Sequence, residues 1–317
     1  DDEIDSTWIW TSQGLVHKVD ENVRVYSWPE ELELAASSAG DLYHLPHGAL
    51  LIHTPKISYS FNRENGQFHR VPNPDTNPFV VLGQFRDGTV CVWIRNRETK
   101  AMPDIRRFDG VQFKPLQFND LDWKVDEVTF FRETSNGDWW FAGNSSLLHL
   151  RGGTHAPEVI SSPSTLPSDR VSALEDMGEG RVWCGMSSGV VFELRGGKWQ
   201  RILSARERVT GILKNSGGTW ISTLDGIYRY YLESWFLYGP GDGLEGAAIY
   251  QVKADVMDQT WAATSRGVYR FHSDADTEPP ESLPPIVQEQ NPSTVEPALV
   301  TFRGRDKWDY TFANDLL

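Results

Sequence analysis

The sequence has little cysteine and no long apolar run, and both absences limit what the protein can be. Its two cysteines, Cys91 and Cys184, are too few for a disulfide framework, and we expect both to be packed thiols. No stretch of about 20 apolar residues is present to span a membrane, and there is no signal-peptide core. We therefore expect a soluble chain and, because it lacks an initiator methionine, a trimmed or mature piece of a longer protein.

Basic charge is also scarce. The chain has 30 Lys and Arg against 44 Asp and Glu, a formal net charge of −14. Proteins that bind a nucleic-acid backbone or an anionic membrane surface need a basic face. We expect neither partner, and we interpret the acidity as a contribution to solubility.

Signals for helices are few. Helix caps and apolar stripes with a 3.6-residue period are scarce. Aromatic residues make up 12% of the chain, 13 of them tryptophan, and such side chains suit a pleated, half-buried surface. The composition predicts an all-β protein.

Local motifs for catalysis and metal binding are absent. The sequence has no Gly-x-Ser-x-Gly elbow, no His-Glu-x-x-His and no phosphate-cradling glycine loop. Its one histidine cluster, His44, His47 and His53, could supply metal ligands from alternate strand positions. We interpret these histidines instead as the border of a turn, and we expect no catalytic residue, no metal and no cofactor.

An internal repeat indicates the architecture. Residues 220–230 (WISTLDGIYRY) and 261–271 (WAATSRGVYRF) agree at Trp, Thr, Gly, Tyr and Arg. Weaker copies recur at a mean spacing of about 42 residues, which fits a four-stranded propeller blade. We predict a seven-bladed β-propeller with four-stranded blades, and the weak second and third copies leave six or eight blades open. The equivalent positions are Trp8, Leu51, Val90, Trp140, Trp183, Trp220 and Trp261.

Each copy has the pattern of an antiparallel meander. A glycine turn such as Asp87-Gly88 or Asn136-Gly137 precedes the tryptophan strand and supplies the positive φ of a tight hairpin. The tryptophan column is expected to fill the spaces between blades. Only residues 1–6 precede the first tryptophan strand, so the innermost strand of that blade is either supplied by the C-terminal segment or missing.

The repeat resembles the two-component regulator propeller repeat, whose pattern is close to Gly-x-x-Trp-x-x-Thr-x-x-Gly-Leu-x-Arg. The copies at Trp8, Trp220 and Trp261 match it best. The resemblance implies the sensor region of a bacterial hybrid two-component protein, in which propellers precede a small β-sandwich with three tyrosines, a membrane helix and a kinase. It also implies a periplasmic or otherwise extracytoplasmic location.

The resemblance divides the chain into three parts. Residues 1–272 match as the propeller. Residues 273–297 are rich in proline and acidic side chains and are predicted as an extended linker. Residues 298–317 resemble the truncated start of the following β-sandwich, with a closing strand of the propeller as the alternative.

The candidate ligand-binding residues lie where the repeats differ. The connections after the tryptophan strands are expected on one face, around the central channel, where polar side chains could hydrogen-bond a sugar or hold a carboxylate. The alternative is that they are solvated loop residues. Asp41, Asp87 and Asp225 are interpreted as turn residues first and as functional candidates second, and Trp139 as either an aromatic platform or a packed outer residue. The candidate set is Arg95, Arg97, Trp139, Asn144, Asp225 and Arg266.

These features favour a non-catalytic, ligand-sensing propeller. It would bind a carbohydrate-like or other small polar ligand and pass a change to downstream domains of the same polypeptide. One alternative is a propeller glycosidase or lyase acting on a polysaccharide, with acids from different blades close together and one pKa raised. Another is a scaffold for protein partners, with an apolar patch on a flat face. Dimer formation is left open.

Overall fold

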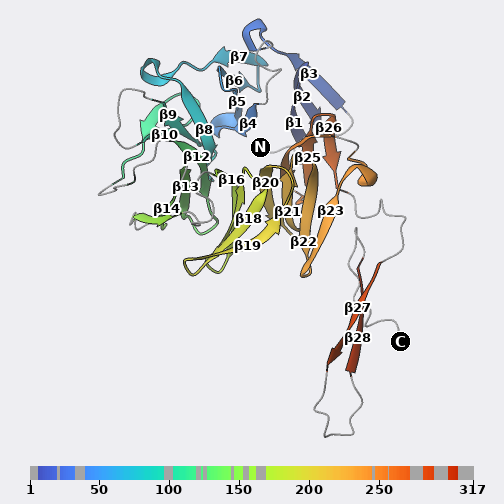
Figure 1. Ribbon diagram of the computed structural model, residues 1–317. Helices are drawn as coiled ribbons and strands as arrows, with labels where there is room; N and C mark the ends of the chain where they lie inside the picture. The colour runs from blue at the N-terminus through green and yellow to red at the C-terminus, as the bar shows by residue number, and fades with distance from the viewer. Residues whose placement is uncertain are drawn as a thin grey trace.

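The fold is seen in a computed structural model of the 317-residue chain. Seven antiparallel sheets stand in a ring, each a meander of consecutive strands (Figure 1). The predicted seven-bladed β-propeller is confirmed. The residues that the structure describes are 6–19, 22–32, 40–95, 103–118, 123, 127–143, 146–152, 157–161, 169–244, 247–255, 257–271, 281–288 and 299–305.

The blades are numbered in chain order. Blades 1 to 4 contain β1 (Ser6–Thr11), β2 (Gly14–Val19) and β3 (Asn22–Ser27); β4 (Asp41–His44), β5 (Ala49–His53), β6 (Ser58–Asn62) and β7 (Gln67–Arg70); β8 (Phe79–Gln84), β9 (Val90–Ile94), β10 (Asp104–Phe108) and β11 (Phe113–Pro115); and β12 (Val128–Glu133), β13 (Trp139–Gly143), β14 (Ser146–Leu150) and β15 (Pro157–Ser161). Blades 5 to 7 contain β16 (Val171–Gly178), β17 (Arg181–Met186), β18 (Val190–Arg195) and β19 (Lys198–Ser204); β20 (Val209–Asn215), β21 (Gly218–Thr223), β22 (Gly226–Tyr231) and β23 (Ser234–Tyr238); and β24 (Ile249–Ala254), β25 (Thr260–Thr264) and β26 (Gly267–Arg270).

Among the described residues, helical structure is confined to short stretches of the connections, and residues 30–32 are α-helical. The 3-10 helices are η1 (Pro46–Gly48), η2 (Pro74–Thr76) and η3 (Pro240–Asp242). In the part of the chain that the structure describes, no helix has the length and apolar character needed to cross a membrane.

Blades 1 and 7 differ from the other five, which have the four strands predicted. Trp8 lies on β1, so β1 takes the position that the second strand has in the other blades. Within the described residues, blade 1 therefore has no innermost strand. Trp261 lies on β25, the second strand of blade 7, and this blade has no described outermost strand. The two blades for which three strands are described are thus the first and the last.

The repeat tryptophans fill the spaces between neighbouring blades, as predicted. Trp140, Trp183 and Trp220 are at most 6% exposed. Trp140 packs with residues of blade 5, Trp183 with residues of blade 6, and Trp220 with residues of blade 7. One blade buries little of its own sheet surface, so these contacts supply the core of the ring.

A position on the third strand stacks on the same tryptophans. In blade 1 the rings of Trp8 and His17 pair across the strands, lie 3.9 Å apart and are nearly parallel. In blade 6 the Arg229 guanidinium is 4.9 Å from the centre of the Trp220 ring. The arginine that follows the repeat's second glycine therefore makes a cation–π contact with the tryptophan of its own blade.

A bulge on the inner strand ties blades 4, 5 and 6 each to the next blade. The register shifts at Thr129, Ser172 and Thr210. Their hydroxyls donate to a carbonyl at the start of the next inner strand, over 3.2, 2.7 and 3.1 Å in blade order. The equivalent bulge in blade 7 holds Tyr250, which is 48% exposed.

The glycine turns have the backbone that the sequence predicts. Gly88 and Gly137 have φ of +86° and +85°. At Gly189, φ is +89° and an added Cβ would lie 2.6 Å from the carbonyl oxygen of Glu207. Any other residue there would be strained twice, by its backbone and by this contact. The two cysteines, also as predicted, are buried and unpaired.

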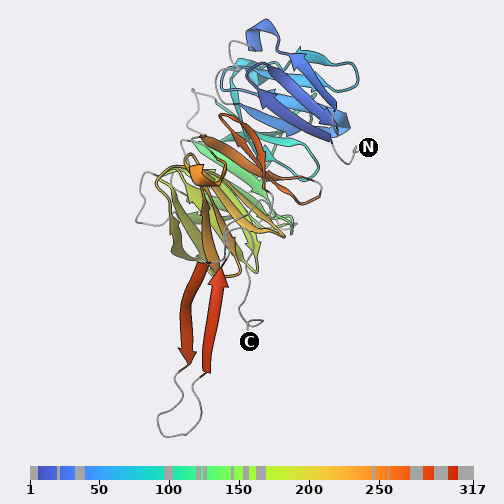
Figure 2. The ribbon, with the colours of Figure 1, turned by 90° about the vertical axis from the view of Figure 1, so that its right-hand side faces the viewer.

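A hairpin extends away from the ring after blade 7 (Figure 2). It pairs β27 (Glu281–Gln288) with β28 (Leu299–Arg305). β27 lies in the segment that we predicted as a linker, so the structure differs there from the prediction. The register shifts between Leu283 and Ile286, and the two prolines between them fall at this irregularity, where a missing N–H interrupts no ladder bond. The domain boundaries stay predictions.

Candidate ligand-binding channel

Three predicted site residues lie on one face of the ring. Strands of a meander alternate in direction, so all connections from second to third strands leave the same face, here called the second-turn face. Arg95 follows β9, Asp225 joins β21 to β22, and Arg266 joins β25 to β26; all three are exposed. No described contact links one of these three side chains to another. Arg97 and Asn144 lie outside the described residues, and the binding role of the set stays a prediction.

Two of these side chains have local contacts. The Thr223 hydroxyl donates to Asp225 Oδ1 at 2.8 Å, and the Arg95 guanidinium lies 5.5 Å from the Trp93 ring centre. Asp225 therefore helps to hold its own turn.

Trp139 lies at the opposite end of its blade. It begins β13 immediately after the turn between the first and second strands, so it belongs to the other face, here called the first-turn face. Its ring is half-buried and packs edge-on against Phe85 of blade 3, with ring centroids 5.3 Å apart. These contacts favour the packed-residue interpretation and separate Trp139 from the other candidates.

A polar depression of about 470 Å³ opens on the first-turn face between blades 3 and 4. Arg86, Asp87, Arg107 and Glu133 line it. Arg107 donates to Asp87 at 2.8 Å, and the Arg86 backbone N–H donates to Glu133 at 2.7 Å. The carboxylates thus already have partners, and Asp87 is a turn residue, as predicted, accepting two bonds from Thr89.

Charged side chains from four blades meet where the inner strands converge. Arg132 of β12 donates to both oxygens of Glu175 on β16, at 2.8 and 2.6 Å. Burial raises the pKa of Glu175, and Arg132 lowers it. The side chain of Glu175 is 12% exposed and that of Arg132 is 39% exposed. This bidentate pair crosses from blade 4 to blade 5.

Lys253 of β24 and Asp41 of β4 complete the charged group. Both are exposed, although they lie on inner strands, so solvent reaches them near the axis of the ring, and this region is here called the channel. Each charge acts on the other, and Arg132 and Glu175 also act on Lys253. Burial by the surrounding blades lowers the pKa of Lys253 and raises that of Asp41. Asp41 is therefore a strand residue that faces the channel, which corrects its assignment to a turn.

A simple register rule describes the positions that the sequence analysis missed. In each of three blades, the residue that pairs with the repeat tryptophan on the inner strand is charged. These residues are Arg132, Glu175 and Lys253. Counting back from the tryptophan through its hairpin turn would have found them.

His53 has a structural role between blades 2 and 3. Its Nδ1 lies 2.8 Å from the Ser58 hydroxyl, and its Nε2 accepts a hydrogen bond from the Val81 N–H at 3.4 Å. Burial, with the charge of Arg95, lowers its pKa to about 4. A neutral ring with Nε2 as the acceptor carries its proton on Nδ1. Among the described residues, no group of three or more His, Cys, Asp or Glu could hold a metal ion.

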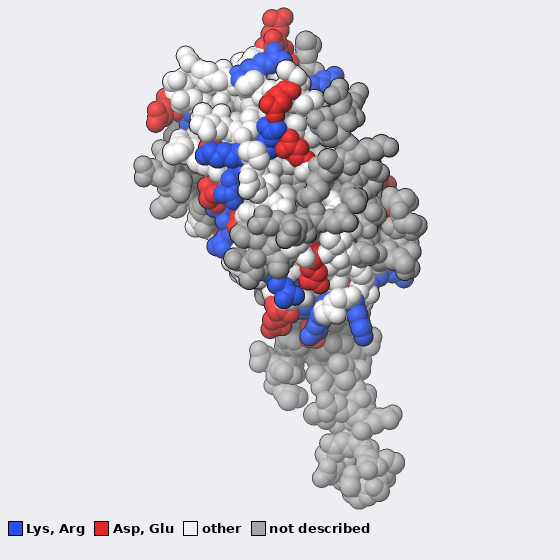
Figure 3. Space-filling view, turned by 90° about the vertical axis from the view of Figure 1, so that its left-hand side faces the viewer, with Lys and Arg blue, Asp and Glu red and all other residues white. Residues whose placement is uncertain are grey.

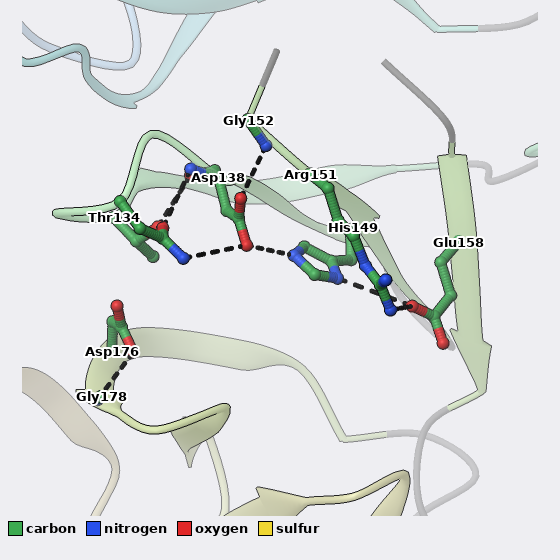
Figure 4. Close-up of polar contacts among 9 residues, drawn as sticks. Thr134, Asp138, His149, Arg151, Gly152, Glu158, Asp176 and Gly178 are labelled. Atoms are coloured by element: carbon green, nitrogen blue, oxygen red, sulfur yellow. Dashed lines mark hydrogen bonds and ion pairs between the residues drawn. The ribbon is translucent and has the colours of Figure 1, made fainter. Parts of the chain in front are cut away.

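A second polar network surrounds His149 on the third strand of blade 4 (Figure 4). His149 Nε2 is 2.9 Å from Asp138 Oδ2, and its ring stacks on Trp140 at 4.0 Å. Asp138 also accepts the Gly152 N–H at 2.6 Å. This network fastens β14 to the turn before β13. We therefore assign it to the stability of the blade.

The channel offers ion-pairing and hydrogen-bonding groups of both signs. Glu175 already has a guanidinium partner. Asp41 and Glu175 both have raised pKa values.

Neither a protein-family model nor a curated protein matches the sequence. Solved structures do match the fold. The extracellular domain of a hybrid two-component system from B. thetaiotaomicron is 14% identical, with a TM-score of 0.61 over 88% of this chain and 37% of that one. The chain thus spans little more than a third of the length of that domain.

Two other propellers are similar to a comparable degree. Catalytically inactive virginiamycin B lyase from Staphylococcus aureus, solved with quinupristin, is 14% identical, with a TM-score of 0.60 over 83% of this chain and 89% of that one. YCF48 bound to a D1 peptide is 13% identical, with a TM-score of 0.53 over 84% and 88%. At this identity the likeness concerns the fold.

Proposed function

We propose that the protein is an extracytoplasmic ligand-sensing propeller of a two-component signalling protein. It binds a carbohydrate-like or other small polar ligand and influences downstream domains of a longer polypeptide. The observation that carries this proposal is the fold shared with the extracellular domain of a hybrid two-component system. The repeat pattern at Trp220 and Trp261 and the charged channel support it.

The test is a search for a ligand that stays intact. A compound that binds only the native state raises the melting temperature. A screen of oligosaccharides, amino acids and small organic acids, followed by calorimetry, is expected to give a lasting shift and an unchanged compound. The absence of binding by every compound at millimolar concentration would contradict the proposal.

An enzyme acting on a polysaccharide is the second candidate, because the lyase shares the fold and two channel acids have raised pKa values. It predicts that a binding compound is consumed and that the melting shift decays with it. Glu175→Gln would abolish this consumption. In the sensing proposal the same variant consumes nothing and still binds.

A protein-binding scaffold is the third candidate, favoured by the peptide complex of YCF48. The exposed apolar side chains that bear on it include Val23 and Val25 of β3. On the side shown in Figure 3, basic and acidic side chains are interspersed. Such a surface suits solubility more than a stable apolar contact.

A further inference from the structure

The seam is the part of the channel wall between blade 7 and blade 2, on either side of blade 1. Two inner-strand positions of the repeat recur there, and in other blades the side chains at these positions have partners. The first is the bulge, whose hydroxyl in blades 4 to 6 donates to the next inner strand. The second is the residue paired with the repeat tryptophan, which in blades 4 and 5 forms the Arg132–Glu175 ion pair. Blade 7 places Tyr250 and Lys253 at these two positions.

Neither seam side chain has such a partner. Within the described residues, Tyr250 and Lys253 make no side-chain hydrogen bond and no ion pair within 4.0 Å, and Tyr250 is 48% exposed. Among the described residues, blade 1 offers no innermost strand that could receive them. Both side chains are thus donors without a described acceptor.

Asp41 is the nearest charged counterpart on the far side of the seam. It interacts electrostatically with Lys253 but forms no ion pair with it. Asp41 pairs with His53, two residues beyond the tryptophan-equivalent Leu51, whereas Lys253 pairs with Trp261 itself. Two strand residues correspond to an axial offset of about 6.6 Å. Lys253 and Asp41 thus stand about one small molecule apart along the channel, and Tyr250, three residues before Lys253 on β24, lies nearer the level of Asp41.

We propose that the seam binds a zwitterion of α-amino-acid size, with its carboxylate at Lys253 and its ammonium at Asp41. The proposal rests on the proposed ligand-sensing function and names the chemical class of its ligand. It also locates that ligand in the channel, between the first and last blades.

Charge complementarity selects a zwitterion over a neutral sugar. The surrounding blades disfavour the charged forms of both Lys253 and Asp41, and the attraction between the two offsets this only in part. A ligand with one charge of each sign compensates both groups at once. Sugar hydroxyls form hydrogen bonds but leave both charges uncompensated. Arg132 and Glu175 compensate each other and do not compete for the ligand.

Calorimetry on the full chain tests this class directly. The probes are a panel of L-α-amino acids, their N-acetyl derivatives, which lack the ammonium, their amides, which lack the carboxylate, and the neutral trisaccharide maltotriose. We expect at least one amino acid to bind and both derivatives of it to bind about tenfold more weakly or worse. Derivatives that bind as tightly as the parent overturn the proposal.

Two variants assign the contacts. Lys253→Met is expected to weaken the amino acid and its N-acetyl derivative, each by about tenfold. Asp41→Asn is expected to weaken the amino acid but to leave the N-acetyl derivative unchanged. The matched controls are Lys198→Met on the outer strand β19 and Glu64→Gln in an exposed turn of blade 2, and both are expected to bind like the parent chain. Melting temperatures of the ligand-free variants show that each is folded.

The outcomes separate this proposal from the broader one. Binding of maltotriose that neither seam variant alters keeps the sensing function and overturns the zwitterion. Binding of an amino acid unchanged by both variants overturns the seam as its site. If no probe binds at about 10 mM, a concentration that would reveal even very weak affinity, the zwitterion is overturned. The wider ligand screen then decides the sensing function.

Discussion

The interfaces from blade 4 to blade 7 and the seam are built from the same repeat positions, with different results. In the regular interfaces a tryptophan is buried and a bulged hydroxyl reaches the next strand, and between blades 4 and 5 a charge also has its partner. At the seam the equivalents Trp261, Tyr250 and Lys253 are half-buried or exposed. The same repeat positions are thus buried and partnered in the regular interfaces and more exposed at the seam, where no inner strand of blade 1 is described.

Replacing the repeat tryptophan with alanine is expected to give the largest difference in stability between a regular interface and the seam. Trp220 is 2% exposed, so Trp220→Ala removes a filled interface and is expected to lower the free energy of unfolding by about 3–5 kcal/mol. Trp261 at the seam is half-buried, and Trp261→Ala is expected to lose less than half as much. Urea unfolding measures both. Equal losses would mean that the seam is as well packed as the other interfaces.

The pH dependence of stability that His53 causes tests the interface between blades 2 and 3. Its pKa of about 4 lies below the ordinary 6.5, so the unfolded chain binds more protons between these values. The stabilisation from the neutral ring is full above pH 6.5 and is lost as the pH falls towards 4, by about 3 kcal/mol. His53→Asn does not titrate. The stability difference between the parent and this variant should therefore shrink from pH 7 to pH 4.5, and a constant difference would contradict the assignment.

Replacing one charged channel residue at a time distinguishes a charge that has an ion-pair partner from a charge that has none. Arg132→Met leaves Glu175 without its partner and is expected to cost about 1–2 kcal/mol at pH 7. The pKa of Glu175 is already raised, and the loss of Arg132 raises it further. The folded state then holds a proton that the unfolded state releases, so the variant loses stability as the pH rises above about 4.5. Lys253→Met, with no ion pair to break, should change stability little, and equal effects would erase the distinction.

The bulged hydroxyls give the smallest effect. Ser172→Ala removes a donor to the Val209 carbonyl at 2.7 Å and is expected to cost about 1 kcal/mol. Tyr250→Phe removes an exposed hydroxyl without a described partner and should fall within about 0.5 kcal/mol of the parent. Chemical denaturation of the two variants is the measurement. A larger loss for Tyr250→Phe would show that its hydroxyl has a structural partner.

The sequence predicted the fold because each copy of the repeat specifies a local structure. A glycine turn, a tryptophan two or three residues later and a second glycine specify one hairpin, and each hairpin is read without knowledge of the others. The blade count followed from spacing alone, even though Leu51 and Val90 replace the tryptophan in two blades. The strand at 281–288 was missed because its two prolines indicate a linker, and only the pairing with β28 shows that they fall at an irregularity.

The candidate channel was predicted far less well. Arg132, Glu175 and Lys253 are more than 40 residues apart in succession, and their proximity follows from closure of the ring. Asp41 stood beside a glycine and was assigned to a turn. Trp139 and Arg95 were grouped because both looked exceptional in sequence, yet strand direction puts them on opposite faces. Residues that come together only through tertiary structure can be found in the sequence by counting their strand pairing relative to a repeat residue.

The bulge hydrogen bonds have a consequence for how such a ring changes over evolutionary time. Each of Thr129, Ser172 and Thr210 reaches the blade that follows at a carbonyl in an equivalent place. A blade can therefore be copied or deleted by recombination with its donor and its acceptor intact, and the new neighbours already fit each other. A ring joined in this way adjusts its blade number by unequal exchange of whole units, and the place where its two ends meet takes up the misfit.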